Sequence, residues 1–428
     1  MYSGSWRTHQ FWFRSQSAMI KEGIKDSDII DGLSLRYLKF FGIWRIVNEY
    51  RTTGKKNAIL KLHLLGTLLL GIPYVIFQFM SYFVIKVDIQ KATILNFNAI
   101  PALQLCCRMF VFTFCMESQC RLYNVLRKDF LNIPKQNLEV KEIFMSISKT
   151  SNFCCTMSLA VNGSIVLFYI IYPGVSVDYI LYHTGSMAAV RTGRKKILGG
   201  WYPVPIDQSP YYEIVFAYEA IVLLWGGFFL AVYFVLFYQV LMCLYAQFSA
   251  LGLQMSSLKI EQYRSDINTS LNHNYISSTV YEELYKLLKD HQKLLRYTEE
   301  LRNVYNPLVT MTLGMGILIL IIGAQTGDPV YIFRFLQLLA YQGIEVSLFC
   351  IGSSSLQTAS SDLQFAIYSS DWYKADIQFR KTAQMLMVRA NKGVTLTAIR
   401  MYPVNVETLM AILQFTYSVS TLMSRMTE

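Results

Sequence analysis

Seven stretches of about 20 mostly apolar residues are the feature of this sequence that most limits its fold. A helix rises 1.5 Å per residue, so about 20 residues cross the roughly 30 Å hydrocarbon layer of a bilayer. Backbone polar groups must be satisfied within the chain in lipid, so such stretches form helices. The predicted spans are residues 61–83, 92–116, 150–172, 214–238, 304–323, 330–351 and 403–424.

The composition agrees with a membrane protein. Hydrophobic residues make up 53% of the 428 residues and charged residues only 16%, which is too apolar for a soluble chain of this size. We therefore predict an all-α integral membrane protein with seven transmembrane helices and a cytoplasmic bundle of helical extensions. The predicted parts are a cytoplasmic N-terminal segment (1–60), helices one to four (61–240), cytoplasmic extensions of helices four and five (241–303), helices five and six (304–356), a cytoplasmic loop with an anchor helix (357–402) and helix seven (403–428).

The distribution of positive charge predicts the orientation. The net charge is +11, but 29 of the Lys and Arg residues lie in the N-terminal segment and in every second connection, against 7 on the other side. Because cationic connections stay in the cytoplasm, we predict a cytoplasmic N-terminus, an extracellular C-terminus and no nucleic-acid partner. The alternative, a metabotropic G-protein-coupled receptor, requires the opposite orientation, and its Asp/Glu-Arg-Tyr and Asn-Pro-x-x-Tyr motifs are missing.

The last span carries one narrow stripe of small hydroxyl residues on an otherwise apolar helix. At 100° per residue, the members of this stripe fall within about 80° of one another. They are Thr416, Ser420, Ser424 and Thr427. A polar stripe on a membrane helix is typical of a surface that faces water, so we predict that it lines an ion path. The alternative is that small residues allow close helix packing without contacting ions.

Two spans continue into the cytoplasm as amphipathic helices. The fourth is expected to run on through Leu258, and apolar residues at helical spacing lead into the fifth. A further helix is predicted over residues 375–390. The predicted anchor and subunit-interface residues are Leu284, Leu287, Leu288, His291, Leu295, Met385 and Leu386. Their apolar faces need a partner, which is either a bundle within one chain or a neighbouring subunit.

The C-terminal sixty residues resemble the insect odorant receptors. The resemblance rests on Trp372-Tyr373, Arg389-Ala-Asn-Lys392, Leu396-Thr397-Ala398, Pro403, Val406-Glu407-Thr408 and the run Ala411 to Ser418. The family pattern has a Gly where this chain has Ile399-Arg400, so the turn before the last span is expected to differ. The order Gln414-Phe415 before Thr416-Tyr417 favours the odorant branch over a gustatory-receptor-like channel. The connection between spans four and five is shorter than in the family's co-receptor.

This resemblance implies a ligand-tuning subunit of an odorant-gated, non-selective cation channel. The implied assembly is a heterotetramer with the odorant co-receptor, in the plasma membrane of olfactory sensory neuron dendrites, around a pore made by the seventh spans. The implied partners are a small volatile odorant, permeant cations and membrane lipid.

A volatile ligand requires an apolar, aromatic pocket between helices. With the predicted orientation, the outer halves of spans two, three, four and six supply the wall. The predicted ligand-binding residues are Phe97, Asn162, Ile165, Phe168, Tyr169, Phe216, Ala220, Tyr331, Phe335 and Tyr341. Asn162, Tyr169 and Tyr331 could orient a polar group of the ligand. Each residue could instead pack in the core or face lipid.

Ionisable residues within spans are costly in hydrocarbon and usually find partners. We predict that Arg108 pairs with Glu345, because both belong in inner halves of their spans. Glu407 either lies in an ion vestibule or stabilises the start of the last helix. The five His show no metal-ligand spacing, and no phosphate loop or catalytic motif is present. The sequence therefore predicts no enzyme, metal or cofactor.

Overall fold

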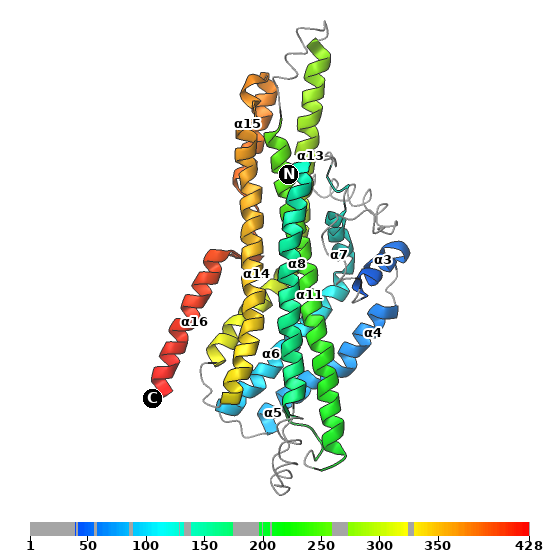
Figure 1. Cartoon of the computed structure of the whole chain (residues 1–428), viewed down its shortest axis with the longest axis vertical. Helices are drawn as coiled ribbons and strands as arrows, with labels where there is room; N and C mark the ends of the chain where they lie inside the picture. The colour runs from blue at the N-terminus through cyan, green and yellow to red at the C-terminus, as the bar shows by residue number, and fades with distance from the viewer. Residues whose placement is uncertain are drawn as a thin grey trace, which may run out of the picture.

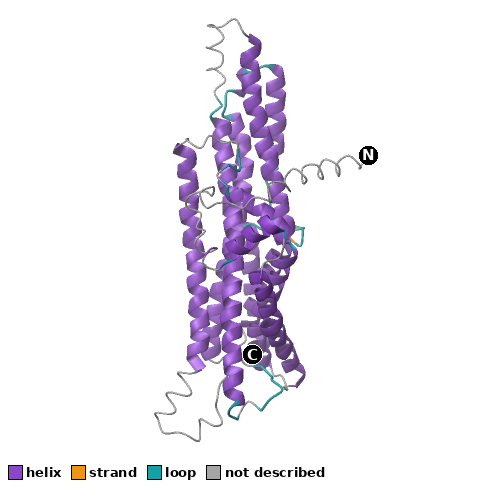
Figure 2. Cartoon of the chain, turned by 90° about the vertical axis from the view of Figure 1, so that its right-hand side faces the viewer, coloured by secondary structure: helices purple, strands orange, loops and turns teal. Residues whose placement is uncertain are grey.

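The computed structural model describes residues 39, 42–54, 58–84, 89–127, 129–131, 138–173, 197–198, 200–205, 208–258, 273–323 and 329–427, without the side chains of 59, 89–97, 172–173, 273–280, 320–323, 329–331, 420 and 423–427. These residues are almost entirely helical (Figure 2), as the sequence predicts. The elements are α3 (Ile43–Thr53), α4 (Ala58–Gly66), η2 (Thr67–Gly71), α5 (Ile72–Val84), α6 (Ile89–Phe114), α7 (Met116–Leu122), η3 (Tyr123–Leu126), α8 (Leu138–Pro173), α11 (Tyr211–Ser256), α13 (His273–Gly323), α14 (Pro329–Tyr368), η6 (Trp372–Lys374), α15 (Ile377–Asn391), β1 (Thr397–Ala398), β2 (Tyr402–Pro403) and α16 (Val406–Thr427).

Helix α11 is the centre of the bundle. It contacts α6, α8, α13 and α14, and most of these helices run along the long axis of the molecule (Figure 1). Its second half, from Phe229 to Leu251, is buried on nearly every face. A helix that is apolar all round must be enclosed by protein or lipid, and here protein encloses it. The predicted overrun of the fourth span is confirmed, because α11 continues without a break to Ser256.

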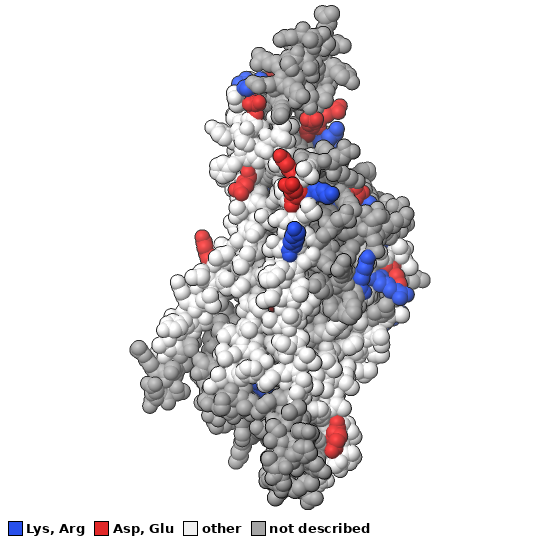
Figure 3. Space-filling view, viewed as in Figure 1, with Lys and Arg blue, Asp and Glu red and all other residues white. Residues whose placement is uncertain are grey.

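All seven predicted spans fall on described helices. Four of these helices are long and apolar enough to cross a membrane, and the bent pair α6 and α7 makes a fifth. Helices α13 and α16 do not meet that criterion over their described residues. The face of the molecule in Figure 3 supports a membrane band, since charged side chains gather toward the end formed by α13, α14 and α15 and few are visible below it.

Two boundaries differ from the sequence prediction. The second span was expected to reach Met116, but α6 ends at Phe114 and the chain turns by 78° into α7. Residues 357–368, expected as loop, continue α14 to Tyr368. This segment contains Thr358, Ser360 and Ser361, and the two Ser hydroxyls donate to carbonyls of their own helix, those of Gln357 and Thr358. Packing against α11, with Leu363 close to Gly252, stabilises a helix that propensity alone does not favour.

The extensions of α11, α13 and α14 and the helix α15 pack mostly on one another within the chain. The Tyr281 hydroxyl of α13 donates to the Asp376 carboxylate at 2.6 Å, and Asp376 also caps α15 by accepting from the Phe379 and Gln378 amides. Most of the predicted anchor residues are buried or half-buried in the main core: Leu284, Leu287, Leu288, His291, Leu295 and Leu386. Met385 is 68% exposed. The intrachain bundle therefore accounts for six of these seven residues.

A short hairpin leads into the last helix. Strands β1 and β2 are antiparallel, and the turn between them holds Ile399 and Arg400 at φ of 52° and 60°. Only glycine takes this left-handed conformation without cost, which explains why the family pattern has a Gly here. The hairpin is fixed to α13, because Asn306 donates to the Thr397 carbonyl at 2.6 Å and the Ile399 amide donates to the Thr310 hydroxyl at 2.8 Å.

The buried His291 predicts a pH dependence of stability. It lies in the extension of α13 that precedes the predicted fifth span, where burial, reinforced by Arg389, lowers the pKa of His291 from 6.5 to about 4. The unfolded chain takes up a proton near pH 6.5 and the folded chain only near pH 4, so folding loses about 3 kcal/mol as pH falls through that window. We expect the unfolding temperature in detergent to drop between pH 7 and 4, and His291→Gln to reduce that drop. An equal drop in the variant would contradict this assignment.

Candidate functional site: an apolar cavity beside a buried ion pair

An apolar cavity lies inside the helix bundle. Its volume is about 110 Å³. For comparison, an engineered apolar cavity of roughly 150 Å³ binds benzene. The wall is formed by η2, α5, α6, α8, α11 and α14, with Leu198 from the connection before α11. The lining residues are Gly71, Tyr74, Asn98, Pro101, Ala102, Leu105, Asn162, Ile165, Val166, Tyr169, Leu198, Val222, Leu223, Gly226, Gly227, Leu230, Leu338 and Tyr341.

Glycines on α11 set the spacing between that helix and its neighbours. A Cβ atom at Gly227 would lie 2.5 Å from Cγ2 of Val166 on α8, and one at Gly226 would lie 3.1 Å from Leu105 on α6. Any side chain at Gly227 would therefore push α8 and α11 apart. Small residues at such contacts are a common way for membrane helices to approach closely.

The cavity brings together four of the ten predicted ligand-binding residues. Asn162, Ile165, Tyr169 and Tyr341 line it. Phe168, Phe216 and Ala220 are half-buried beside it, against the cluster around Tyr74 and Tyr169. Phe335 packs on the cluster of Ile100, Ile319 and Leu338. Phe97 and Tyr331 lie in α6 and α14, and their side chains are outside the described residues. The ligand role of all ten remains a prediction.

The cavity lies deeper along α11 and α14 than the sequence suggested. On α11 it begins at Val222, later in the helix than the predicted Phe216 and Ala220. On α14 it is lined by the predicted Tyr341 and by Leu338, and not by Phe335, about one turn before Leu338. Sequence reasoning also missed the first span and the Gly226-Gly227 pair. Two adjacent glycines in a membrane helix were a visible signal of close packing that was not used.

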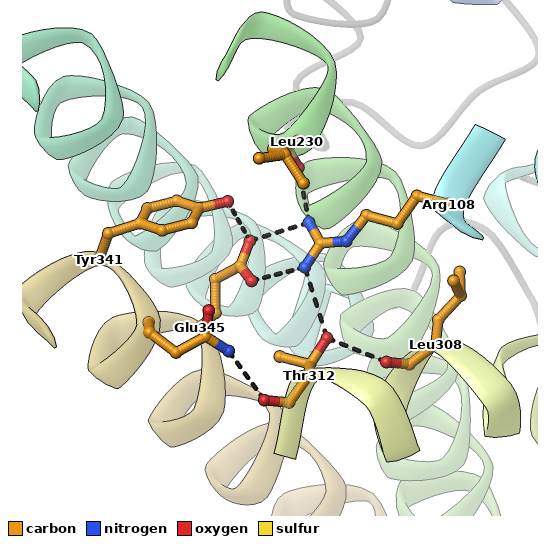
Figure 4. Close-up of polar contacts among 7 residues, drawn as sticks. Arg108, Leu230, Leu308, Thr312, Tyr341 and Glu345 are labelled. Carbon is orange, nitrogen blue, oxygen red and sulfur yellow. Dashed lines mark hydrogen bonds and ion pairs between the residues drawn. The ribbon is translucent and has the colours of Figure 1, made fainter. Parts of the chain in front are cut away.

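A buried ion pair is bonded to two residues of the cavity wall, Leu230 and Tyr341 (Figure 4). Arg108 of α6 donates to both carboxylate oxygens of Glu345 on α14, at 3.0 and 2.6 Å, which confirms the predicted pair. The same guanidinium donates to the Leu230 carbonyl of α11 at 2.7 Å and reaches the Thr312 hydroxyl of α13 at 3.4 Å. The Tyr341 hydroxyl, from the cavity wall, donates to Glu345.

This cluster joins four helices at one point. The side chains of Arg108 and Glu345 are 4% and 0% exposed. A bidentate guanidinium–carboxylate pair of this kind fixes geometry as well as contributing energy. Gln342 adds a hydrogen bond to the Thr312 carbonyl at 2.8 Å, which ties α14 to α13. The cavity wall at Tyr341 and Leu230 is therefore bonded to the contact between α6, α13 and α14.

A second carboxylate beside the cavity also has hydrogen-bond partners. Glu219 of α11 is fully buried and accepts hydrogen bonds from the Leu198 amide at 3.1 Å and the Tyr202 hydroxyl at 2.8 Å. These bonds hold the connection before α11 against the bundle and place Leu198 in the cavity wall. Arg334 of α14 lies 4.9 Å from the centre of the Tyr169 ring, a cation–π contact behind the wall.

The last helix, α16, stands at the edge of the bundle (Figure 1) and contacts α13 and α14. Of the predicted hydroxyl stripe, Thr416 is buried and its hydroxyl donates to the Ile412 and Leu413 carbonyls of its own helix. The side chains of Ser420, Ser424 and Thr427 lie outside the described residues. Asn405 caps the helix by accepting from the Thr408 amide at 2.8 Å, and the exposed Glu407 lies in its first turn.

Comparison with known proteins decides the family. A family model described as 7tm odorant receptor matches residues 96–417, three quarters of the sequence. The chain belongs to the insect odorant receptor family. The matched region includes α8, α11, α13 and α14 in full and most of α6 and α16, and thus most of the cavity wall and the whole ion-pair cluster.

Curated relatives of this odorant receptor are distant in sequence. Odorant receptor 42a of Drosophila melanogaster is 25% identical over 34% of this chain and 37% of its own length. Odorant receptor 24a of the same species is 31% identical over 32% and 35%. The matches thus span about a third of these two relatives. Odorant receptor 30a, also from Drosophila melanogaster, is 23% identical over 82% of this chain and 89% of its own length.

The fold of this odorant receptor has a solved counterpart. The insect olfactory receptor OR5 from Machilis hrabei superposes with a TM-score of 0.67 at 15% identity, covering 97% of this chain and 98% of that one. That receptor has been solved alone and in complex with eugenol. At this identity the likeness establishes the shared helical membrane fold.

Proposed function

We propose that this chain is the odorant-binding subunit of a heteromeric odorant-gated cation channel, with the cavity as the volatile's binding site. The apolar cavity between the helices is the observation that carries the proposal. Most of its wall comes from α6, α8, α11 and α14, the helices of the four spans from which a pocket was expected, with η2, α5 and Leu198 completing it, and the related OR5 receptor has been solved with eugenol. Burying apolar surface contributes about 25 cal/mol per Å², so a small hydrocarbon skeleton gains affinity without charged contacts.

The pore is proposed to run along α16. Its exposed surface carries large apolar side chains, which need cover from neighbouring subunits or lipid. These are Met410, Leu413, Phe415, Tyr417 and Leu422. Because Thr416 is buried against its own chain, the proposed contact with ions falls mainly on Ser420, Ser424 and Thr427. Glu407, exposed at the start of the helix, is placed in the cytoplasmic vestibule.

The proposed orientation puts the N-terminus and the extensions in the cytoplasm. The excess of Lys and Arg on that side supports it. The C-terminal end of α16 also points away from the end that holds α15 (Figure 1).

On the cytoplasmic bundle, Met385 and the nearby Val388 are exposed and apolar, and we assign the contact with the co-receptor subunit to that surface.

Whole-cell recording tests this function. Cells that express the chain together with the odorant co-receptor are expected to give an inward cation current on exposure to a chemically diverse panel of neutral volatiles. The current should persist when G-protein signalling is blocked, because the ligand and the pore belong to one assembly. Cells with the co-receptor alone are the control. A current that disappears under the block would replace the channel with a metabotropic receptor.

A further inference from the structure

Asn162 is one of two polar groups in the cavity wall for which no hydrogen bond is found among the described residues. It lies on α8, is 8% exposed and lines the cavity. Its amide is therefore satisfied only by what enters the cavity, and an amide left without any partner in apolar surroundings is unfavourable. An Asn can both donate and accept, so a ligand oxygen could satisfy it as a carbonyl, an ether or a hydroxyl.

Most of the other polar groups in the wall already make hydrogen bonds within the chain. The Tyr341 hydroxyl donates to Glu345, the Tyr74 hydroxyl accepts from Gln78 at 2.8 Å, and Asn98 donates to the Leu198 carbonyl. The Tyr169 hydroxyl is the second group for which no hydrogen bond is found among the described residues. Seven residues separate it from Asn162 on the same face of α8, a rise of about 10 Å. A small volatile can therefore reach one of the two groups but not both.

The cavity has no place for an ion. Its lining contains no Asp, Glu, Lys or Arg. The nearest carboxylates already have partners. Glu345 is paired with Arg108, and Glu219 accepts hydrogen bonds from the Leu198 amide and the Tyr202 hydroxyl. A carboxylate or an ammonium group would lose its hydration without gaining a counter-charge. The size of the cavity further limits the ligand to a short skeleton.

We propose that Asn162 determines ligand specificity by hydrogen-bonding the single oxygen of a small, neutral ketone, ester, ether or alcohol, whose hydrocarbon part fills the apolar remainder of the cavity. This assignment rests on the proposed function of the cavity. The Gly227 backbone supports it, because a Cβ there would lie 3.2 Å from the Asn162 side-chain oxygen, so glycine leaves the amide room beside the cavity.

Five probes with the same carbon skeleton test the proposal: hexane, 2-hexanone, 2-hexanol, hexanoate and hexylammonium. In the full assembly with the co-receptor, the ketone and the alcohol are expected to act at concentrations about tenfold lower than hexane, and the two ions are expected to be inactive. Asn162→Leu keeps a similar volume. It should raise the half-maximal concentration of the ketone and the alcohol about tenfold and change that of hexane by less than about twofold.

Matched variants separate recognition from folding. Asn152→Leu, on the same helix but outside the cavity, should leave all responses at wild-type values once surface expression is normalised. Equal weakening of all neutral probes by Asn162→Leu would overturn the specificity role, and so would a selective loss of the polar probes in Tyr169→Phe instead. If no neutral probe evokes a current while the co-receptor's own current is intact, both the proposed function and this inference are wrong.

Discussion

Replacing Glu345 with leucine while Arg108 remains is expected to remove most of the receptor from the cell surface. The substitution leaves a guanidinium that is 4% exposed without its carboxylate and takes the acceptor from the Tyr341 hydroxyl. Removing one partner of a buried pair typically costs about 3–5 kcal/mol. That is a large part of the roughly 5–15 kcal/mol that stabilises a folded protein. Surface labelling of an extracellular tag, compared with total expression, measures the loss.

The pair, rather than either charge, is what the fold requires. The double variant Arg108→Met/Glu345→Leu replaces both groups with apolar side chains, so it should recover much of the surface expression lost in the single variant. Glu49→Gln breaks an exposed pair with Arg45 on α3 and serves as the control, because such pairs contribute about 0–1 kcal/mol. Equal loss in the single and double variants would show that Glu345 acts outside the pair.

The spans and the ion pair were predictable because each depends on one simple constraint. Lipid requires long apolar helices, and a buried Arg requires a carboxylate at a similar depth. The extension of α14 to Tyr368 was not predictable in this way. Its Ser-rich sequence favours a loop, and the helix is stabilised by packing on α11 and by the Ser360 hydroxyl, which accepts from the Val394 amide at 2.7 Å. Such tertiary contacts are not visible in local propensity.

The cavity was predictable in its helices but only partly in its residues. On α8, helical periodicity gives most of the answer, because Asn162, Ile165 and Tyr169 follow one face and line the cavity, although Val166 lines it too and the predicted Phe168 does not. On α11 the choice of residues depends on depth, and depth is set by where Gly226 and Gly227 let neighbouring helices approach. From a single sequence one can predict which face of a helix is buried. The position along the helix axis at which the packed helices leave a cavity cannot be predicted in this way.

The second large effect is expected at Gly227. In Gly227→Ala the new Cβ would lie 2.5 Å from Val166, an approach that requires α8 and α11 to separate or Val166 to move toward the cavity. Overpacking of this kind costs about 1–3 kcal/mol. A shift of Val166 into the cavity must be reversed when a ligand enters, so at least about 1 kcal/mol of this cost should fall on binding and raise the half-maximal concentration of an active volatile about fivefold or more. Concentration–response curves in the assembly with the co-receptor, normalised to surface expression, measure the shift.

Gly163→Ala supplies the matched control for that experiment. Gly163 lies on α8 next to Asn162, but a Cβ there meets nothing within 4 Å, so the added methyl should be silent or slightly stabilising through better helix propensity. A response that shifts equally in both variants would mean that glycine in the bundle acts through helix flexibility. A shift confined to Gly227→Ala ties ligand sensitivity to the distance between α8 and α11, the two helices whose close approach shapes the cavity beside Asn162.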